Sequence, residues 1–170
     1  MTVNYKLDAM LDLRKYLWDQ LQVAGIFDPE DYDTTGTGNI LNPIIPVQQP
    51  AEFNQFLSGK KHIVYDKINL TYEDNWMICN EQILFTIYAI DVADINEITN
   101  FMVDLFRRMD ESARDINFSD QSSPQFKFYN TYVADISPTT PSKELQGFLS
   151  SDVIVEIKYS RILDQNGRYA

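Results

Sequence analysis

The sequence predicts a single α+β domain, in which an antiparallel sheet carries two helices packed on one of its faces. Apolar residues recur at helical spacing in two separate stretches, and runs rich in β-branched and aromatic residues come in hairpin-like pairs. The chain has 170 residues, of which 44% are hydrophobic and 23% charged, and these values suit one packed core. The sequence contains no internal repeat or domain break, so residues 1–170 are expected to form one domain.

Two stretches have apolar residues at three- and four-residue spacing and predict helices. The first runs from about Leu7 to Ala24, and Gly25 behind it is a usual helix-ending residue. The second runs from Asp91 to Arg114, with Asp94 and Glu97 at the spacing of a capping box. Its apolar stripe consists of Ile95, Ile98, Phe101, Met102, Leu105, Phe106 and Met109.

Four longer stretches have the composition of strands. A polar turn at Glu73–Asn75 separates the first two, which therefore predict a long hairpin. The second stretch ends in ILFTIYAI, which is apolar on both faces and is expected to be covered on each side. In the last stretch Val153, Val155, Ile157 and Tyr159 alternate with more polar positions. The four stretches are His62–Tyr72, Met77–Asp91, Phe126–Ile136 and Asp152–Leu163.

The remaining segments are shorter or more polar. Prolines in Asn42–Pro50 exclude a helix and a central strand, so Ile44, Ile45 and Val47 predict a short edge strand. Glu52–Gly59 predicts a helical turn or a loop. The connection at 137–150 is polar and proline-containing, and we expect it to project from the body. Residues 164–170 are expected to form a short mobile tail.

The charge of the chain argues against a protein that grips nucleic acid. The formal net charge is −11 with only 14 Lys and Arg, whereas binding to DNA phosphates requires clustered cations. An acidic surface would instead let DNA slide past without adhering. No apolar run is long enough to span a membrane, and Met1–Lys15 lacks the apolar centre of a signal peptide. Cys79 is the only cysteine, which excludes an internal disulfide and fits a reducing compartment of synthesis.

Few residues are suited to catalysis. His62 is the only histidine, it lies inside a predicted strand as Cys79 does, and neither is flanked by residues typical of a nucleophile turn. We therefore expect no enzymatic activity, no cofactor and no metal site. The loop Asp31–Gly36 places oxygen-bearing side chains at alternate positions, as a calcium loop does. Its twelfth position is Asn42 instead of a bidentate Glu, so we do not expect it to bind calcium.

The order of these elements resembles the tail-terminator (tail-completion) proteins of tailed bacteriophages. The features that carry the resemblance are the opening helix ending in LWDQLQVAG, the proline-broken edge strand NPIIPVQQP, and the strand ILFTIYAID leading into the helix DINEITNFMVDLFRRM. The last strand, DVIVEIKYSRI, completes the pattern. The likeness spans nearly the whole chain but is architectural, because no short motif defines the family. The polar connection at 137–150 departs from it.

This resemblance implies a structural protein of the virion, made in the host cytoplasm. Such a protein forms a ring, expected to be a homohexamer, on the last ring of the tail tube, where it ends polymerisation and joins tail to neck. Its partners would be copies of itself, the tail tube protein, a neck protein and, in contractile tails, the sheath protein. DNA would pass through the ring without specific binding, and no membrane would be involved.

The sequence also offers candidate contact and channel residues for such a ring. Aromatic residues are concentrated in the strand Phe126–Ile136, and interfaces favour aromatic side chains. The contact candidates are Phe126, Phe128, Tyr129, Tyr132, Ile136 and Phe148. A DNA channel should be acidic or neutral, and the candidates for its lining are Asp28, Glu30, Asp31, Asp33, Asp66 and Asp91.

Two other interpretations stay open from the sequence alone. The chain fits a different neck adaptor or a tube-related phage protein, which would form a ring with another neighbour. It also fits a small cytosolic enzyme or ligand-binding α+β domain. That second interpretation requires a pocket between sheet and helices, with His62 or clustered carboxylates pointing into it.

Overall fold

The computed structural model describes residues 9–48, 51–73, 78–119 and 126–161, with the side chains of 51–53 and 161 excepted. The expected α+β class is confirmed: a six-stranded sheet has the strand order β1-β2-β3-β6-β4, and β5 pairs with β6 beyond the end of β4. The helices are α1 (Ala9–Val23), α2 (Ala51–Phe56), α3 (Val92–Phe106) and α4 (Asp110–Phe118), with a 3-10 turn, η1, at Pro29–Tyr32. The strands are β1 (Ile44–Pro46), β2 (His62–Tyr72), β3 (Ile78–Ala89), β4 (Phe126–Ile136), β5 (Thr140–Pro141) and β6 (Leu149–Arg161).

The sheet is mixed, which corrects the expectation of a purely antiparallel one. Four strands are antiparallel to their neighbours, in the order β2, β3, β6 and β4, and β1 adds a short parallel pairing with β2. The expected edge strand is therefore present as β1, but it runs parallel to its neighbour β2 instead of antiparallel. Arg14 of α1 covers its outer side, because the guanidinium donates to the backbone carbonyls of Ile44 and Asn42. Burial lowers the pKa of Arg14.

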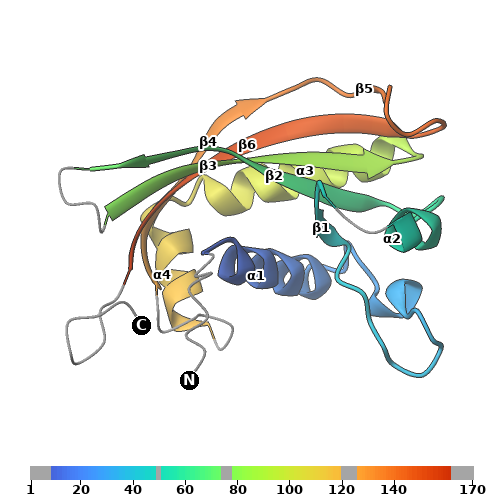
Figure 1. Ribbon diagram of the computed structural model, residues 1–170, viewed down its shortest axis with the longest axis horizontal. Helices are drawn as coiled ribbons and strands as arrows, with labels where there is room; N and C mark the ends of the chain where they lie inside the picture. Colours follow the sequence, from blue (N-terminus) through green and yellow to red (C-terminus); the bar gives the residue numbers. More distant parts are fainter. Residues whose placement is uncertain (1–8, 49–50, 74–77, 120–125, 162–170) are drawn as a thin grey trace.

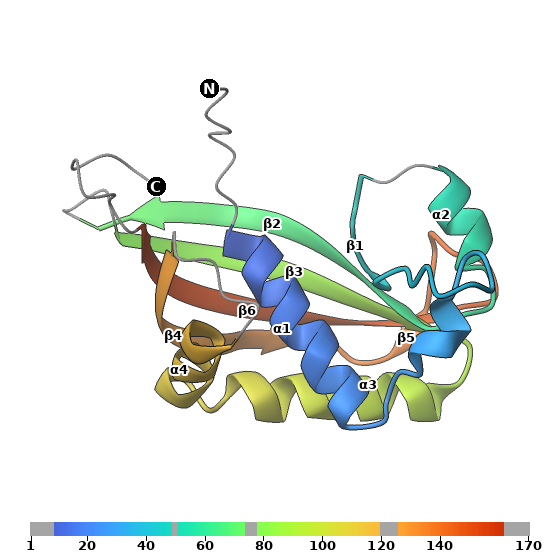
Figure 2. The same cartoon turned by 90° about the horizontal axis from the view of Figure 1, so that it is seen from below.

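The helices α1, α3 and α4 all lie on one face of the sheet, as Figures 1 and 2 show. Alternate residues of the two central strands point toward them and are buried, which gives one continuous core. The rings of Phe85 on β3 and Phe106 on α3 stack at 6.4 Å between centroids. Gly25 ends α1 with φ +72°, the left-handed conformation that its position predicted. The inward residues of β6 are Val153, Val155, Ile157 and Tyr159, as the alternation predicted.

The second predicted helix is in fact two helices, which corrects the single span expected from Asp91 to Arg114. The chain leaves α3 after Phe106, passes Met109 at φ 52°, and re-enters helix at Asp110. The Thr131 hydroxyl of β4 donates to the carbonyl oxygens of Phe106 and Met109, at 3.0 and 3.3 Å. The same two carbonyl oxygens also accept from backbone amides, that of Phe106 from Met109 at 3.4 Å and that of Met109 from Ala113 at 3.1 Å, so Thr131 adds a link from β4 to the break. The break turns α4 onto β4 (Figure 2).

The beginning of α3 also differs from the expected capping box. Asp91 is the N-cap residue, and its carboxylate accepts a hydrogen bond of 2.9 Å from the backbone amide of Ala93. Asp94 lies inside the first turn and pairs with Lys61 at 3.6 Å. The cap therefore lies three residues before the position that the sequence pattern suggested.

The connection at 137–150 does not project freely, which corrects another expectation. Thr140 and Pro141 pair with Ser150 and Leu149 of β6, so this segment folds back along the sheet. Its end is held by Phe148, which is buried. The amide of Ser142 donates to the carbonyl of Phe148 at 2.8 Å and closes the turn. The tail expected at 164–170 lies outside the described residues.

Candidate assembly surface

The face of the sheet opposite α1, α3 and α4, called the open face here, carries none of these helices (Figure 1). The 140–144 segment lies beside part of this face and lines a cavity of ≈ 310 Å³ with Leu84, Thr86 and Asp152. The side chains of the open face are mostly half-buried and are joined across β3 and β6 by hydrogen bonds. Thr86 donates to Asp152 at 2.8 Å, and Gln82 donates to Glu156 at 3.1 Å. Leu84 and Ile154 pair between these two polar pairs. The strand ILFTIYAI is thus covered by helices on one face only. Its second face carries polar side chains that are hydrogen-bonded to β6 and tolerate contact with water.

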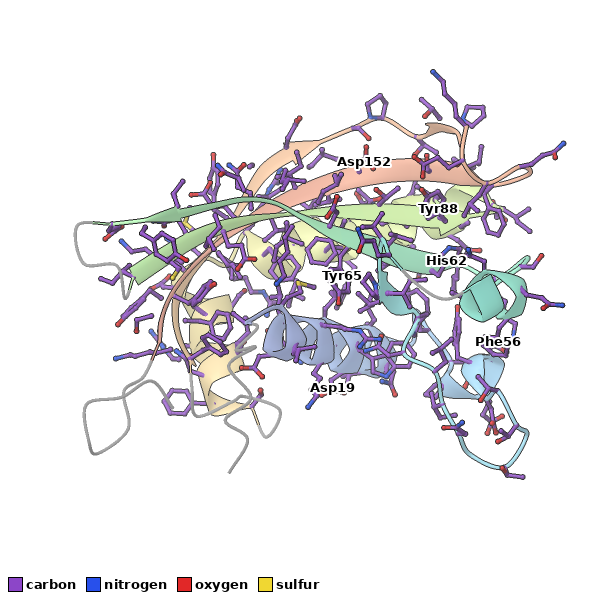
Figure 3. The ribbon with its side chains drawn as sticks, viewed as in Figure 1. Asp19, Phe56, His62, Tyr65, Tyr88 and Asp152 are labelled. Atoms are coloured by element: carbon purple, nitrogen blue, oxygen red, sulfur yellow. The ribbon has the colours of Figure 1, made fainter. Side chains whose placement is uncertain are left out.

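An aromatic cluster lies at one end of this open face. The ring of His62 stacks on Tyr88 at 5.2 Å and meets the edge of Phe148 at 5.6 Å. The Tyr88 hydroxyl donates to Glu144 at 3.2 Å, so the 142–148 turn is fastened at two points. Figure 3 shows His62 and Tyr88 on neighbouring strands close to α2. Burial and the nearby carboxylate of Glu144 raise the pKa of Tyr88 to about 12.

His62 is buried and held by a hydrogen bond to the backbone. Its Nδ1 lies 2.8 Å from the carbonyl oxygen of Lys60, which fixes this nitrogen as the protonated one. Burial lowers the pKa of His62, and the Lys60 carbonyl opposes that shift in part. A cavity of ≈ 150 Å³ lies beside the ring, lined by Asn54, Ser58, Gln146 and apolar residues. This cavity lies between the end of β2, Asn54 of α2 and the 142–148 turn, away from α1, α3 and α4.

His62 and Cys79 cannot form a catalytic pair. His62 pairs with Tyr88 at one end of the β2–β3 hairpin, whereas Cys79 pairs with Tyr72 at the other. Tyr88 lies nine positions along β3 from Cys79, which corresponds to about 30 Å. Cys79 also belongs to the buried core on the helix side. Within the described ranges, no three His, Cys, Asp or Glu side chains are grouped as a metal site requires, and no helix is long and apolar enough to cross a membrane.

The loop that resembles a calcium site uses its carboxylate to hold its own backbone. The two carboxylate oxygens of Asp33 accept hydrogen bonds from the amides of Thr35, Gly36 and Gly38 at 2.8–3.1 Å. These bonds lower the pKa of Asp33, with the Gly38 amide contributing most. The alternating oxygen-bearing residues are therefore explained by the fold of the loop.

The six acidic channel candidates do not form one surface. Asp28 caps η1 through the amide of Glu30, Asp91 caps α3, and Asp33 holds its own loop. Glu30 and Asp31 border a cleft beside Lys60 and Lys61. Asp66 alone lies on the open sheet face, opposite Leu84 of β3. The sequence reasoning passed over Asp152 and Glu156, which share that face and could have been found from the alternation of β6.

The contact candidates divide into buried and exposed residues. Phe126, Phe128 and Phe148 are buried within the chain, so they are not available as subunit contacts and that expectation was wrong for them. Phe126 and Phe128 pack against Tyr159 in the core, with ring centroids 5.5 and 5.9 Å from it. The other three remain candidates, because the exposed fractions are 41% for Tyr129, 50% for Tyr132 and 39% for Ile136.

The opposite edge of the sheet is a second apolar surface that sequence reasoning missed. β1 pairs only with residues 63–65 of β2, which leaves residues 66–72 without a neighbouring strand on that side among the described elements. Within this segment Ile68, Leu70 and Tyr72 are 45%, 41% and 51% exposed. Exposed apolar residues on an unpaired strand edge indicate a site for association, because proteins usually protect such edges.

A scan against protein-family models finds no match to this chain. No curated protein matches its sequence either.

Proposed function

We propose that this chain is a structural assembly protein that closes into a ring with copies of itself, in the manner of a phage tail terminator. One observation carries the proposal: within the part of the chain that the structure describes, a sheet covered by helices on one face ends in two edges without a further strand, each with exposed apolar side chains. Two different patches on one molecule favour head-to-tail contacts, and such contacts produce closed rings when the rotation between subunits closes.

The element order supports the more specific role at a tail end. An opening helix, an edge strand, a hairpin leading into the α3 helix and a long final strand reproduce the arrangement on which the resemblance to tail terminators was based. The net charge of −11 and the carboxylates on the open sheet face are consistent with a ring through which DNA passes. The ring would contact the tail tube protein on one side and a neck protein on the other.

The experiment mixes the purified chain with tails assembled in its absence and follows capping by negative-stain electron microscopy. We expect a ring on one end of each tube, a uniform tube length and restored joining to heads. The variant Asn100→Ala, changed at an exposed position of α3, is the matched control and should behave as the wild type. Tubes that stay uncapped, with the chain forming no ring, would rule the proposal out. A ring that binds heads instead of tubes would identify a neck adaptor.

A further inference from the structure

A small cavity opens beside the only histidine of the chain, where β2 begins close to α2 (Figure 3). Its volume is ≈ 150 Å³, and its wall is formed by α2 with the residues that follow it, the start of β2 and the 142–148 turn. Three segments that are far apart in the sequence therefore surround one space. The residues that line it are Asn54, Leu57, Ser58, His62, Leu145, Gln146 and Phe148.

The buried part of the cavity lining is mainly apolar, and the exposed part is polar. Leu57 and Phe148 are buried, whereas Asn54, Ser58 and Gln146 are exposed and form the mouth. An engineered cavity of about 150 Å³ with an apolar lining binds benzene. The cavity of this chain therefore admits a ligand of the size of one six-membered ring.

His62 supplies one buried hydrogen-bond acceptor to this space. The side chain is only 3% exposed, and the rings of Tyr88 and Phe148 hold it in place at 5.2 and 5.6 Å. Its Nδ1 donates to the Lys60 carbonyl, so Nε2 is the unprotonated nitrogen and can only accept. Nε2 has no hydrogen-bond partner among the described residues. A buried acceptor without a partner costs free energy, and a donor placed in the cavity removes that cost.

The charges around the cavity favour an uncharged ligand. Within the described part of the chain, none of the lining residues is a lysine, arginine, aspartate or glutamate. Burial lowers the pKa of His62, so the imidazole is neutral at pH 7. The carboxylate of Glu144, on the same turn, accepts from the Tyr88 hydroxyl and does not line the cavity. An ionised ligand would therefore lose its hydration without an opposite charge to offset the loss.

We propose that this cavity is a binding site for an uncharged single-ring compound that carries a hydroxyl or N–H donor. The ring of the ligand lies against Leu57 and Phe148, and its donor bonds to Nε2 of His62. The polar side chains at the mouth can bond a second polar group that points to solvent. Water is the competing occupant, and a ring ligand displaces it from the apolar part of the lining. This inference goes beyond the proposed function, because the site does not require a ring of subunits.

The test uses phenol as the probe and fluorobenzene, a similar ring without a donor, as its control. A single histidine gives one pair of imidazole nitrogen-15 resonances, so an NMR titration reports on His62 directly. We expect phenol to shift the Nε2 resonance until the site is saturated, while Nδ1, which is bonded to Lys60, moves little. Phenol should bind about tenfold more tightly than fluorobenzene, because it forms one additional hydrogen bond.

Variants at two positions test whether the probe binds in this cavity. Ser58→Phe places a ring at the exposed mouth and should abolish the phenol-induced shift, whereas the matched Ser58→Ala should retain it. His62→Phe keeps a ring but removes Nε2, so phenol should then bind no more tightly than fluorobenzene in ligand-observed NMR. The Ser58 pair decides the question independently of how well His62→Phe folds. An Nε2 resonance that phenol leaves unmoved, equal affinities of the wild type for the two probes, or undiminished binding to Ser58→Phe would overturn the proposal.

Discussion

The protonation of His62 affects the stability of the folded protein. Burial lowers its pKa in the folded protein, whereas in the unfolded chain a histidine has a pKa of about 6.5. The unfolded state therefore binds the proton more readily, and the folded state loses stability as the pH falls below that unfolded value. The loss continues until the pH reaches the lowered pKa of the folded state.

We predict that the free energy of unfolding falls between pH 7 and pH 5 with a His62 contribution of up to about 1.4 kcal/mol per pH unit. Urea denaturation at several pH values measures it. The variant His62→Gln cannot take up this proton, so its pH dependence should be flatter by that amount, although its stability at pH 7 is lower. Equal slopes for the two proteins would show that His62 is not buried as the cluster requires. Since this is the only histidine, no other side chain with an ordinary pKa titrates in this window.

At the scale of elements, α3 holds its face of the sheet through a stripe of apolar residues. Leu105 and Phe106 are buried, and Phe101 is half-buried against the same core. We predict that Leu105→Ala lowers the free energy of unfolding by about 2–5 kcal/mol, because a buried leucine leaves a cavity. The exposed Asn96→Ala on the same helix should change it by less than about 0.5 kcal/mol. Thermal or urea unfolding checks both, and similar small effects would show that the stripe is not core.

The elements with strong periodicity could be predicted from the sequence, and the exceptions have local physical causes. The alternation of β6 and the long β2–β3 hairpin were visible because side-chain burial has a period of two in a strand. The break after α3 was not, because Met109 adopts a positive φ without a glycine to announce it. The hydroxyl of Thr131, a residue far along the chain, bonds to the Phe106 carbonyl at this break.

The face of the sheet to which each β4 side chain points explains why some of the contact candidates were wrong. Strict alternation would place Phe126, Phe128 and Tyr132 on one face. A bulge at Tyr129 shifts the pairing between Phe128 and Asn130, so the two phenylalanines face the core while Tyr132 faces outward. A bulge has no reliable sequence signal in such a stretch. The free edge of β2 was missed for a related reason, because the extent to which β1 covers it depends on tertiary pairing.

At the scale of the whole molecule, the two faces of the sheet differ in chemistry. One face buries the core under three helices, and the other carries Asp66, Asp152 and Glu156 together with Lys127 and Lys158. Lys158 on this face pairs with Glu73 at 2.6 Å, and this carboxylate offsets the positive charge of the lysine. We propose that this second face lines the channel of the ring.

We predict that Asp152→Lys combined with Glu156→Lys leaves rings intact but impairs genome delivery, because lysines in the lumen would bind DNA phosphates. The defect should be larger at low salt, where screening is weak. The matched control is Glu97→Lys with Asp104→Lys, which makes the same change of charge on the exposed side of α3. The measurement is genome ejection by both pairs of variants at two salt concentrations. Equal effects of the two pairs, or none from the first, would show that the open face does not line the channel.

Electron cryo-microscopy of phage tails assembled in the presence of this chain tests the proposed role most directly. The account predicts density for a closed ring of copies at the head-proximal end of the tail tube. Density for the chain elsewhere in the particle, its absence from the particle, or a monomer at the neck would contradict the proposed role.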